Sequence, residues 1–241
     1  MSPSSSGPAR IVVVVGLARE ARIAAVPAVR PVIGGGAGAR LTSALERVVA
    51  DGARAIISFG IAGGLDPSLA PGACIVGSAA TVGVARWPTD AGWTKKLMTA
   101  LPGAILADVA GVDHPVASVA HKRLLRAASG AAAVDMESHR AARVAAAHCL
   151  PFAILRIVCD PANRALPPAA LVGMRNDGTS DVGAVLRALI GTPGQIPDLI
   201  RLALDARVAF AHLKRRRDSL GPIFALANTF PRPADRRANL L

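Results

Sequence analysis

Carboxylate side chains stand at the ends of two short apolar segments in residues 131–164. Asp135 and Glu137 close the segment "AAAVDME", and Asp160 closes "PFAILRIVCD". A carboxyl group can protonate a leaving group, and a carboxylate can stabilise positive charge that develops as a bond breaks. Because open α/β sheets bind ligands where their strands end, this strand–helix–strand segment predicts an active site.

Glycines follow several of the other apolar segments. Gly16 ends "IVVVV" (11–15) and is followed by Glu20, and the clusters "GGGAG" (34–38) and "FGIAGG" (59–64) lie further along the chain. Glycine lets a ligand approach the backbone closely and tolerates a positive φ. The sequence contains no dinucleotide-binding GxGxxG after the first strand, no Walker A pattern, no HExxH and no GxSxG.

The cysteines indicate neither a metal site nor a disulfide framework. The chain has three of them and no CxxC pair. A sparse, odd-numbered set is typical of a protein in a reducing compartment. We therefore predict no metal ion and no disulfide.

Apolar patterning predicts strands that alternate with helices. We expect strands at residues 11–15, 54–60, 73–83, 104–112, 114–120, 131–136 and 151–158, and helices within residues 34–52, 121–130, 138–149, 179–191 and 196–217. Residues 86–102 show no clear pattern. Such alternation predicts an α/β protein with a mixed or parallel sheet covered on both faces.

The length of 241 residues suits one α/β domain with a sizeable core. We expect a disordered tail at residues 1–10, a single domain at residues 11–217 and an irregular basic tail at residues 218–241. The first ten residues, "MSPSSSGPAR", lack the apolar centre of a signal peptide, so we expect a cytoplasmic protein.

The charge of the chain limits its partners. Hydrophobic residues make up 52% of the chain, but no uncharged apolar run reaches the roughly 18 residues that a membrane span needs. The net charge of +12 suits nucleic acid, an anionic membrane surface or an anionic substrate. Aromatic residues are only 3% of the chain, which disfavours base stacking, so we expect no nucleic-acid partner. Strongly salt-dependent DNA binding would contradict that expectation.

Three motifs carry a family resemblance. The segments "ISFGIAGGLDPSLAPGACIV" (57–76), "VDMES" (134–138) and "RIVCDPA" (156–162) resemble, in this order, the nucleoside phosphorylase / methylthioadenosine–adenosylhomocysteine nucleosidase superfamily. The resemblance covers roughly residues 10–191. It implies a three-layer α/β/α sandwich with a central mixed, partly closed sheet.

Within that superfamily the chain most resembles the bacterial hopanoid-associated phosphorylases. The segments "GLAREARIAA" (16–25) and "SGAAAVDMESHRAARVAAAHCLPFAILRIVCDPANRALPPAA" (129–170), together with the basic C-terminal helix, carry this resemblance. It implies cleavage of the adenine N-glycosidic bond of adenosylhopane during the synthesis of extended hopanoid lipids. It also leads us to expect a homodimer or a higher homo-oligomer.

The resemblance assigns roles to the acidic residues. It implies that Asp160 is the general acid that protonates N7 of the purine, so that adenine leaves as a neutral molecule. It implies that Glu137 accepts hydrogen bonds from the ribose hydroxyls and that Met136 packs on the sugar. We expect Asp135 to face away and to be structural, because alternate strand residues point to opposite sides. A non-catalytic nucleoside-binding protein is the competing class, and the presence of both Asp160 and Glu137 argues against it.

Further substrate contacts are implied around the glycine-rich strand end. We expect Ile61, Ala62 and Gly63 to contact the nucleoside, and Val134 to lie beside Met136 in the same site.

The acceptor of the ribosyl group has two candidates. In nucleosidases a glutamate just after the first strand activates water, and Glu20 stands near that position. In phosphorylases, arginines and glycine backbone hold phosphate, and Gly16, Arg19 and Arg40 are the candidates here. We expect phosphate as the co-substrate, with no other cofactor, and hydrolysis as the alternative. Ser58 and Ile61 stand where phosphorylases of this kind carry Arg and Ser or Thr, which weakens the usual phosphate site.

The C-terminal helix suggests a contact with a membrane. Its apolar residues Leu199, Leu202, Ala206, Phe210 and Leu213 form one stripe, and the helix ends in "KRRR" (214–217). The stripe suits a helix packed on the core. A basic amphipathic helix also binds anionic lipid, so peripheral contact with the inner membrane is the second expectation.

Overall fold

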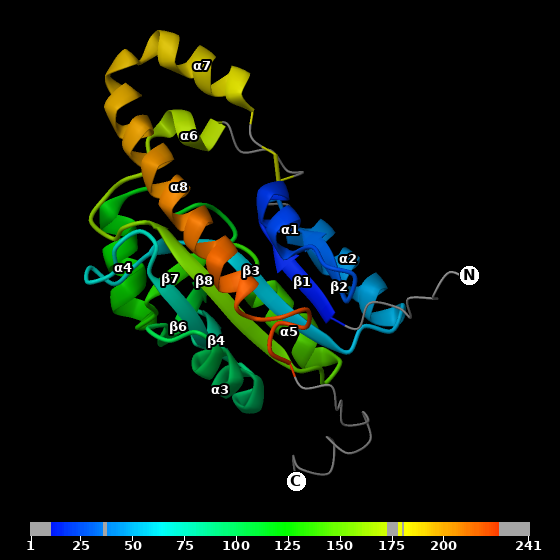
Figure 1. Ribbon diagram of the computed structural model, residues 1–241. Coiled ribbons are helices and arrows are strands. Elements are labelled where there is room, and N and C mark those ends of the chain that lie inside the picture. The colour runs from blue at the N-terminus through cyan, green and yellow to red at the C-terminus, as the bar shows by residue number, and fades with distance from the viewer. Residues whose placement is uncertain (1–10, 36–37, 173–177, 180, 227–241) are drawn as a thin grey trace.

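A mixed β-sheet lies at the centre of the structure, with helices on both of its faces (Figure 1). The computed structural model describes residues 11–35, 38–172, 178–179 and 181–226. Within these residues the strands are β1 (Ile11–Val15), β2 (Val29–Ile33), β3 (Ala55–Gly64), β4 (Cys74–Val82), β5 (Ala85–Pro88), β6 (Ile105–Gly111), β7 (Ala133–Asp135) and β8 (Phe152–Asp160).

Helices connect most of these strands. Within the described residues they are α1 (Ala18–Ala24), α2 (Gly38–Ala50), α3 (Ala91–Ala100), α4 (Val119–Ser129), α5 (Ser138–Ala147), α6 (Pro168–Val172), α7 (Val182–Gly191), the 3₁₀ turn η1 (Pro193–Gln195) and α8 (Ile196–Asp218). In these ranges no helix combines the length and the hydrophobicity that a bilayer crossing requires.

The sheet is closed over part of its width. Its strand order is β2-β1-β3-β7-β6-β4-β5, and β8 pairs with both β3 and β4. Strands β3, β7, β6, β4 and β8 therefore form a ring. The β1–β3 and β3–β8 pairs are parallel, whereas β3–β7 and β4–β8 are antiparallel. The predicted mixed, partly closed α/β sheet is confirmed.

Strand β1 shows how both faces of the sheet are covered. Its five residues are all buried, which explains the unbroken apolar run. Val13 packs in a core with residues of α1, α3 and α8, and Val12 and Val14 pack in a second core with residues of α2 and α5. Figure 1 shows α8 crossing one face of the sheet while α5 lies behind it.

Several elements differ from the predictions. Residues 114–120 do not form the expected strand; they are a loop and the start of α4, where the Ser118 side chain accepts a hydrogen bond from His121 N at 3.1 Å. Strand β2 was not predicted because Pro31 lies inside it, and proline is tolerated there since β2 is an edge strand. Helix α3 falls in the segment that showed no clear pattern.

The chain after α8 belongs to the core as far as it is described. Residues 219–226 have no regular secondary structure, but Phe224 is fully buried. The indole Nε1 of Trp93 donates to Phe224 O at 2.7 Å, and the rings of Phe59 and Phe224 pack edge to face at 5.3 Å. The packed region therefore extends beyond the predicted boundary at residue 217. The predicted tail at residues 1–10 and the rest of the C-terminal tail, 227–241, lie outside the described residues.

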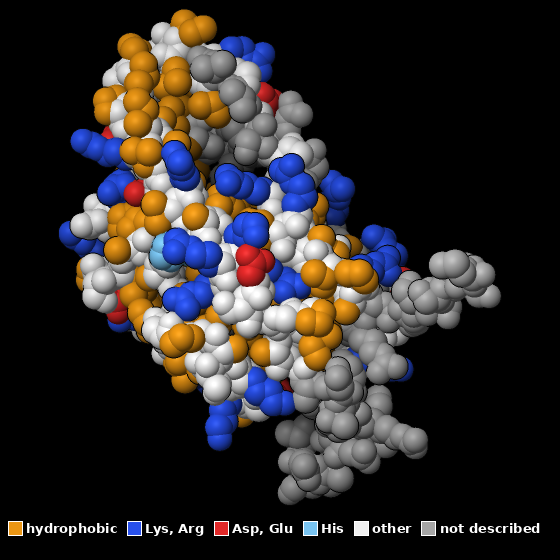
Figure 2. All heavy atoms as spheres, viewed as in Figure 1, with side chains coloured by type: hydrophobic (Ala, Val, Ile, Leu, Met, Phe, Trp, Pro, Cys, Tyr) orange, Lys and Arg blue, Asp and Glu red, His pale blue; other side chains and the backbone are white. Residues whose placement is uncertain are grey.

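A group of helices projects from one end of the sheet. It consists of α6, α7, η1 and residues 196–208 of α8, and we call it the helical arm (Figure 1). Figure 2 shows apolar side chains gathered on this end of the molecule.

Candidate active site

The predicted acidic residues converge where β1, β3 and β8 end. These three strands are parallel, so their carboxyl ends meet at one edge of the sheet. Glu20 lies in α1, directly after β1, and Asp160 is the last residue of β8. Glu137 follows β7, which runs back along the end of β3.

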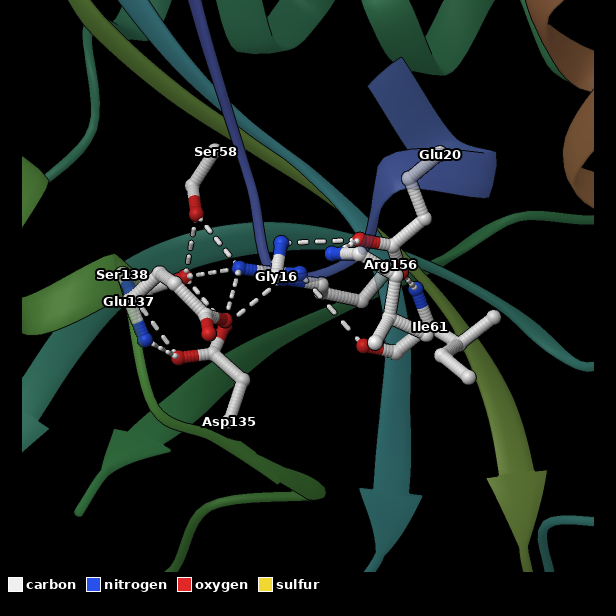
Figure 3. Close-up of polar contacts among 9 residues, drawn as sticks. Gly16, Glu20, Ser58, Ile61, Asp135, Glu137, Ser138 and Arg156 are labelled. Atoms are coloured by element: carbon white, nitrogen blue, oxygen red, sulfur yellow. Dashed lines mark hydrogen bonds and ion pairs between the residues drawn. The ribbon is translucent and has the colours of Figure 1, made fainter. Parts of the chain in front are cut away.

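Glu20 is held by backbone N–H groups. Its Oε2 accepts from Gly16 N at 2.8 Å and Leu17 N at 2.9 Å, and its Oε1 accepts from Ile61 N at 2.7 Å (Figure 3). Burial raises the pKa of Glu20, whereas Arg156 and the three N–H donors oppose that rise. Gly60 makes room for this carboxylate, because a Cβ at that position would lie 2.4 Å from Oε1.

Glu137 lies beside Gly16 and Gly34 and is only 7% exposed. A Cβ on Gly16 would come within 2.9 Å of Glu137 Oε1, and one on Gly34 within 2.8 Å of its Cγ. Burial raises the pKa of Glu137 to about 7; Arg156 opposes the rise, and the neighbouring charges of Asp135 and Glu20 add to it. This carboxyl group therefore changes charge near neutral pH.

Arg156 is the centre of this acidic group, and sequence reasoning did not identify it. It is fully buried, with Nε 2.6 Å from Asp135 Oδ2 and Nη2 3.4 Å from Glu137 Oε2. Nη2 also donates to Ser58 Oγ at 2.6 Å. A buried charge requires partners, so the lone charged residue within the apolar segment "PFAILRIVC" was an available signal.

Asp135 organises the start of α5. Its Oδ1 accepts from Glu137 N at 3.1 Å and Ser138 N at 2.8 Å, and its Oδ2 contacts Ser138 Oγ and Arg156. A carboxylate at a helix start satisfies free N–H groups and interacts well with the helix dipole. Strand alternation predicted that Asp135 would face away from Glu137, but the structure places the two side chains around the same arginine. The contacts of Asp135 are all internal to the fold.

Asp160 forms a buried ion pair that the sequence did not reveal. Its Oδ2 lies 2.5 Å from Nζ of Lys122, which comes from α4 and is fully buried. Lys122 also donates to the carbonyl oxygens of Pro161 at 2.8 Å and Arg164 at 2.9 Å. Burial raises the pKa of Asp160, and the Lys122 ammonium opposes that rise. A Cβ on Gly63 would lie 3.3 Å from Asp160 Oδ2, so β3 passes closely by this carboxyl group.

A β-bulge places Asp160 opposite Gly63. Ala62 pairs with Val158, and the next residue of β3, Gly63, pairs with Asp160, so Cys159 is the extra residue of β8. Bulges redirect side chains and are common beside active sites.

Known proteins give the family of this chain. The pattern of the phosphorylase superfamily matches residues 14–191. The chain belongs to the phosphorylase superfamily. The matched segment contains Glu20, Glu137 and Arg156, which belong to the first acidic centre of this superfamily member, and Asp160, which forms the second. No curated protein sequence matches the chain.

Solved structures of nucleosidases share the fold of this superfamily member. The 5′-methylthioadenosine/S-adenosylhomocysteine nucleosidase of Campylobacter jejuni has a TM-score of 0.58 and 14% identity, over 86% of this chain and 99% of that chain. The Streptococcus pneumoniae nucleosidase with the transition-state inhibitor MT-ImmA has a TM-score of 0.55 and 18% identity, over 85% and 98%. Futalosine hydrolase of Helicobacter pylori has a TM-score of 0.54 and 16% identity, over 62% and 87%. At these identities the likeness concerns the fold.

The other predicted substrate contacts lie between the two acidic centres. Ile61, Ala62 and Gly63 are consecutive residues of β3, and Val134 of β7 pairs with Gly63. Met136 is half-buried between Asp135 and Glu137. The structure thus brings this superfamily member's predicted substrate-binding residues to one strand end.

The three phosphate candidates have different places in the superfamily fold. The N–H of Gly16 is already bound to Glu20. The guanidinium of Arg19 stacks on the ring of Phe210, 4.1 Å from its centroid. Arg40 lies on α2 and lines a groove of about 560 Å³ together with Gly34, among others. The structure therefore brings Gly16 into the acidic site, leaves Arg19 against α8 and puts Arg40 in a groove beside Gly34.

Strand β3 sets the spacing of the two centres. Gly60 lies against Glu20 and Arg156, and Gly63 lies against Asp160. Three residues of extended strand span about 10 Å. This arrangement gives one end where the carboxyl groups of Glu20, Asp135 and Glu137 surround Arg156, and another end with a single carboxyl group, that of Asp160. Among the described residues, no group of three or more His, Cys, Asp or Glu side chains is arranged to hold a metal ion.

Proposed function

We propose that this superfamily member hydrolyses the N-glycosidic bond of a purine nucleoside and releases the free base, adenine. One observation carries the proposal: two acidic centres contact the same strand end, Glu20 and Arg156 at Gly60 and Asp160 at Gly63, and these strand positions are about 10 Å apart along β3. A nucleoside spans such a distance with its ribose at the first centre and its base at the second.

Asp160 serves the base end of the substrate. Its proton passes to N7 of the purine while the C1′–N9 bond breaks, and the electron pair of that bond stays with the base. Adenine then leaves as a neutral molecule, and Asp160 is left as a carboxylate. Burial, which raises the pKa of Asp160, favours the protonated form that this step needs.

Glu137 and Glu20 serve the sugar end. The bond breaks through a ribosyl group with positive charge, which nearby carboxylates stabilise. Glu137 accepts hydrogen bonds from the ribose hydroxyls, and Met136 packs beside them. Glu20 takes a proton from water as the water oxygen bonds to C1′, so one proton enters Glu20 for the one that left Asp160.

Three arguments favour water over phosphate as the acceptor of the ribosyl group. The resemblance had led us to expect phosphate, with water as the alternative. The N–H groups of Gly16, Leu17 and Ile61, which could bind an anion, already bind Glu20. Arg19 stacks on Phe210. A phosphate dianion would also meet the charges of the acidic group around Arg156. The groove that Arg40 lines is the observation that favours the phosphorylase alternative.

The assay that tests this function separates the two acceptors. The purified chain is incubated with adenosine, methylthioadenosine and adenosylhopane, with and without phosphate, and adenine, ribose and ribose-1-phosphate products are quantified. We expect adenine release without phosphate. An absolute requirement for phosphate would replace hydrolysis by phosphorolysis, and no adenine release under any condition would overturn the proposal. Asp160→Asn should slow release by roughly 10²- to 10⁴-fold.

The proposed 5′ substituent is the hopane tail of adenosylhopane. The resemblance of residues 16–25 and 129–170 to hopanoid-associated phosphorylases supports this substrate. The helical arm also lies near the site: Arg164, four residues after Asp160, pairs with Asp205 of α8, and Ala18 N at the start of α1 donates to O of Gly178, which lies between α6 and α7, at 3.0 Å. A preference for adenosylhopane over methylthioadenosine in the same assay would support it, and the reverse preference would favour a methylthioadenosine or adenosylhomocysteine nucleosidase.

The helical arm also supports a peripheral membrane contact on the cytoplasmic side. Of the twelve large aliphatic side chains that are exposed among the described residues, six lie on or at the edge of the arm. They are Val172, Ile190, Ile196, Ile200, Leu204 and Val208. The stripe predicted from the sequence is a different one, because its residues Phe210 and Leu213 are buried in the core.

The charge of this apolar surface favours contact with an anionic bilayer over contact with a second copy of the same chain. The exposed Arg187 and Arg207 stand among these residues, and the chain carries a net charge of +12. Two copies that met through this surface would bring like charges together, whereas anionic headgroups would attract them. A homo-oligomer formed through other surfaces remains an expectation.

Vesicle sedimentation tests the membrane contact. We expect the chain to bind vesicles of phosphatidylcholine and phosphatidylglycerol more strongly than phosphatidylcholine alone. Ile200→Ser with Leu204→Ser should reduce that binding, and the matched pair Val84→Ser with Leu124→Ser, exposed elsewhere, should not. Equal binding by all variants would contradict the proposal. A concentration-dependent molecular mass that the first pair abolishes would instead assign the surface to a second copy.

A further inference from the structure

Lys122 is a fully buried cation at the base end of the site. Its Nζ lies 2.5 Å from Asp160 Oδ2, 2.8 Å from Pro161 O and 2.9 Å from Arg164 O. An ammonium group has three N–H donors and no acceptor. All three donors are therefore used, and Lys122 has none left for a ligand.

We propose that Lys122 is a positioning residue for Asp160: it fixes Oδ2, leaves Oδ1 for the nucleobase, and stabilises the carboxylate that remains when Asp160 gives up its proton. This inference rests on the proposed function. It gives a role to a residue that neither the resemblance nor the family assignment singles out.

The hydrogen bonds decide which oxygen carries the proton. Because Lys122 donates to Oδ2, the acidic hydrogen of Asp160 belongs on Oδ1. Gly63 lies beside this carboxyl group, since a Cβ there would lie 3.3 Å from Oδ2 and 3.5 Å from Oδ1. The purine N7 can then receive the proton from a fixed direction, and orientation of this kind contributes directly to rate.

The charge balance of the proton transfer favours the products. Before transfer, a neutral carboxyl group faces the ammonium of Lys122. After transfer, a carboxylate faces the same ammonium, so an ion pair forms at the moment the C1′–N9 bond breaks. Such a pair is stronger in a buried site than in water, and an interaction that strengthens during the reaction lowers its barrier.

Other charges also face Asp160. Burial raises the pKa of Asp160, Lys122 lowers it, and Asp205 of α8 adds to the rise; Arg164 pairs with Asp205. Cys159 is uncharged, because burial raises the pKa of its thiol to about 12. Loss of the Lys122 charge should therefore raise the pKa of Asp160.

The first test compares pH profiles of base release from adenosine by the full chain. In Lys122→Gln, which keeps hydrogen-bond donors but not the charge, we expect kcat to fall at least about tenfold with little change in KM. The apparent pKa at which activity is lost on the alkaline side of the profile should rise by about one unit or more. Lys122→Arg should keep this apparent pKa near its wild-type value. An unchanged apparent pKa in Lys122→Gln would overturn the inference.

A second substrate separates positioning of the acid from general damage. An N7-methylated purine nucleoside releases its base without a proton, so Lys122→Gln should cleave it at nearly the wild-type rate. Equal slowing of both substrates would assign Lys122 a purely structural role.

A titration that needs no activity keeps the inference apart from the proposed function. In chain labelled with ¹³C-aspartate, with the signal assigned by Asp160→Asn, the Asp160 carboxyl should titrate at lower pH in the wild type than in Lys122→Gln. The same pKa in both would overturn the inference even if nucleosides are cleaved. A failure of the wild type to release any base would overturn the proposed function while this titration still reports on the ion pair.

Discussion

The carboxylate of Glu20 accepts a hydrogen bond from the backbone N–H of Ile61 at 2.7 Å, across 41 residues of chain. This contact joins the start of α1 to the strand end on β3. It fixes one oxygen of Glu20 in the site while the other binds Gly16 and Leu17. The residue that we propose to activate water is therefore positioned by backbone, not by neighbouring side chains.

Replacing Glu20 with Gln should abolish most of the turnover. The amide cannot accept a proton from water, so we expect adenine release to fall by roughly 10²- to 10⁴-fold. Its NH₂ group would also face one of the N–H donors, which should cost about 1–3 kcal/mol of unfolding free energy. Rate assays and urea denaturation measure the two effects. Near-normal turnover in a folded Glu20→Gln variant would remove Glu20 from the mechanism.

Gly60→Ala should displace Glu20. The added Cβ would lie 2.4 Å from Glu20 Oε1 and 2.8 Å from Arg156 Nη1, so the carboxylate or the guanidinium must move. We expect at least a tenfold loss of activity. Gly52→Ala is the matched control, because Gly52 also has a positive φ, +102°, but no atom within 4 Å of the added Cβ. The control should lose stability and keep its activity; equal activity of the two variants would contradict the prediction.

Glu137 should make both stability and ligand affinity depend on pH. Its pKa rises from 4.5 in the unfolded chain to about 7 in the fold, so the folded state binds the proton more tightly. Stability contributed by this group is then present below pH 4.5 and is lost as the pH rises through 7. Relative to Glu137→Gln, the wild type should lose unfolding free energy between pH 5 and pH 8 in urea titrations. Parallel curves for the two proteins would show that Glu137 is not the group responsible.

Nucleoside affinity should follow the opposite trend. The carboxylate of Glu137 accepts from ribose hydroxyls better than the protonated acid, so the Kd of a non-cleavable nucleoside should fall as the pH rises from 6 to 8. Calorimetry with 9-deazaadenosine, whose C–C glycosidic bond cannot be cleaved in this way, and with its 2′,3′-dideoxy form isolates the ribose contribution. A flat Kd for 9-deazaadenosine over this range would count against the ribose-binding role.

Arg156 should be essential for the fold. Arg156→Met leaves Asp135, Glu137 and Glu20 in one buried group without their cation, which should cost about 3–5 kcal/mol of unfolding free energy. Adding Asp135→Asn should recover part of that loss, because one of the unpaired charges is removed. Denaturation of the two variants measures the recovery. A double variant that is less stable than Arg156→Met would show that Asp135 acts mainly through the N–H groups of α5.

The sequence pointed to those candidate-site residues that follow apolar runs. Glu20, Glu137 and Asp160 each follow such a run, and the parallel strands bring them to one edge of the sheet. Lys122 was missed because "HKRLLR" has the composition of a solvated helix, and only packing distinguishes the buried lysine from its exposed neighbours. Arg156 was missed although a charged residue in a buried strand always needs a partner.

The fold was predicted less evenly. The buried strands β1, β3, β4 and β8 were recognisable because strands covered on both faces are apolar throughout. Elements at the margins carry a weaker pattern. Strand β5 alternates between partly buried and exposed residues, and the first half of α8 is largely exposed. The stripe read from the sequence of α8 marks its core-facing side, because Phe210 and Leu213 are buried and Leu202 and Ala206 pack against the same core.

Strand β8 is hydrogen-bonded on both sides, to β3 and to β4, and it carries both Arg156 and Asp160. A strand held in this way opens only when the sheet itself opens. The proposed sugar end and the proposed base end of the site therefore behave as one rigid body. If the helical arm contacts the group attached to the nucleoside, as we propose, descendants of this chain could change that group by altering the arm, while a change of base or sugar would require the sheet itself to be rebuilt.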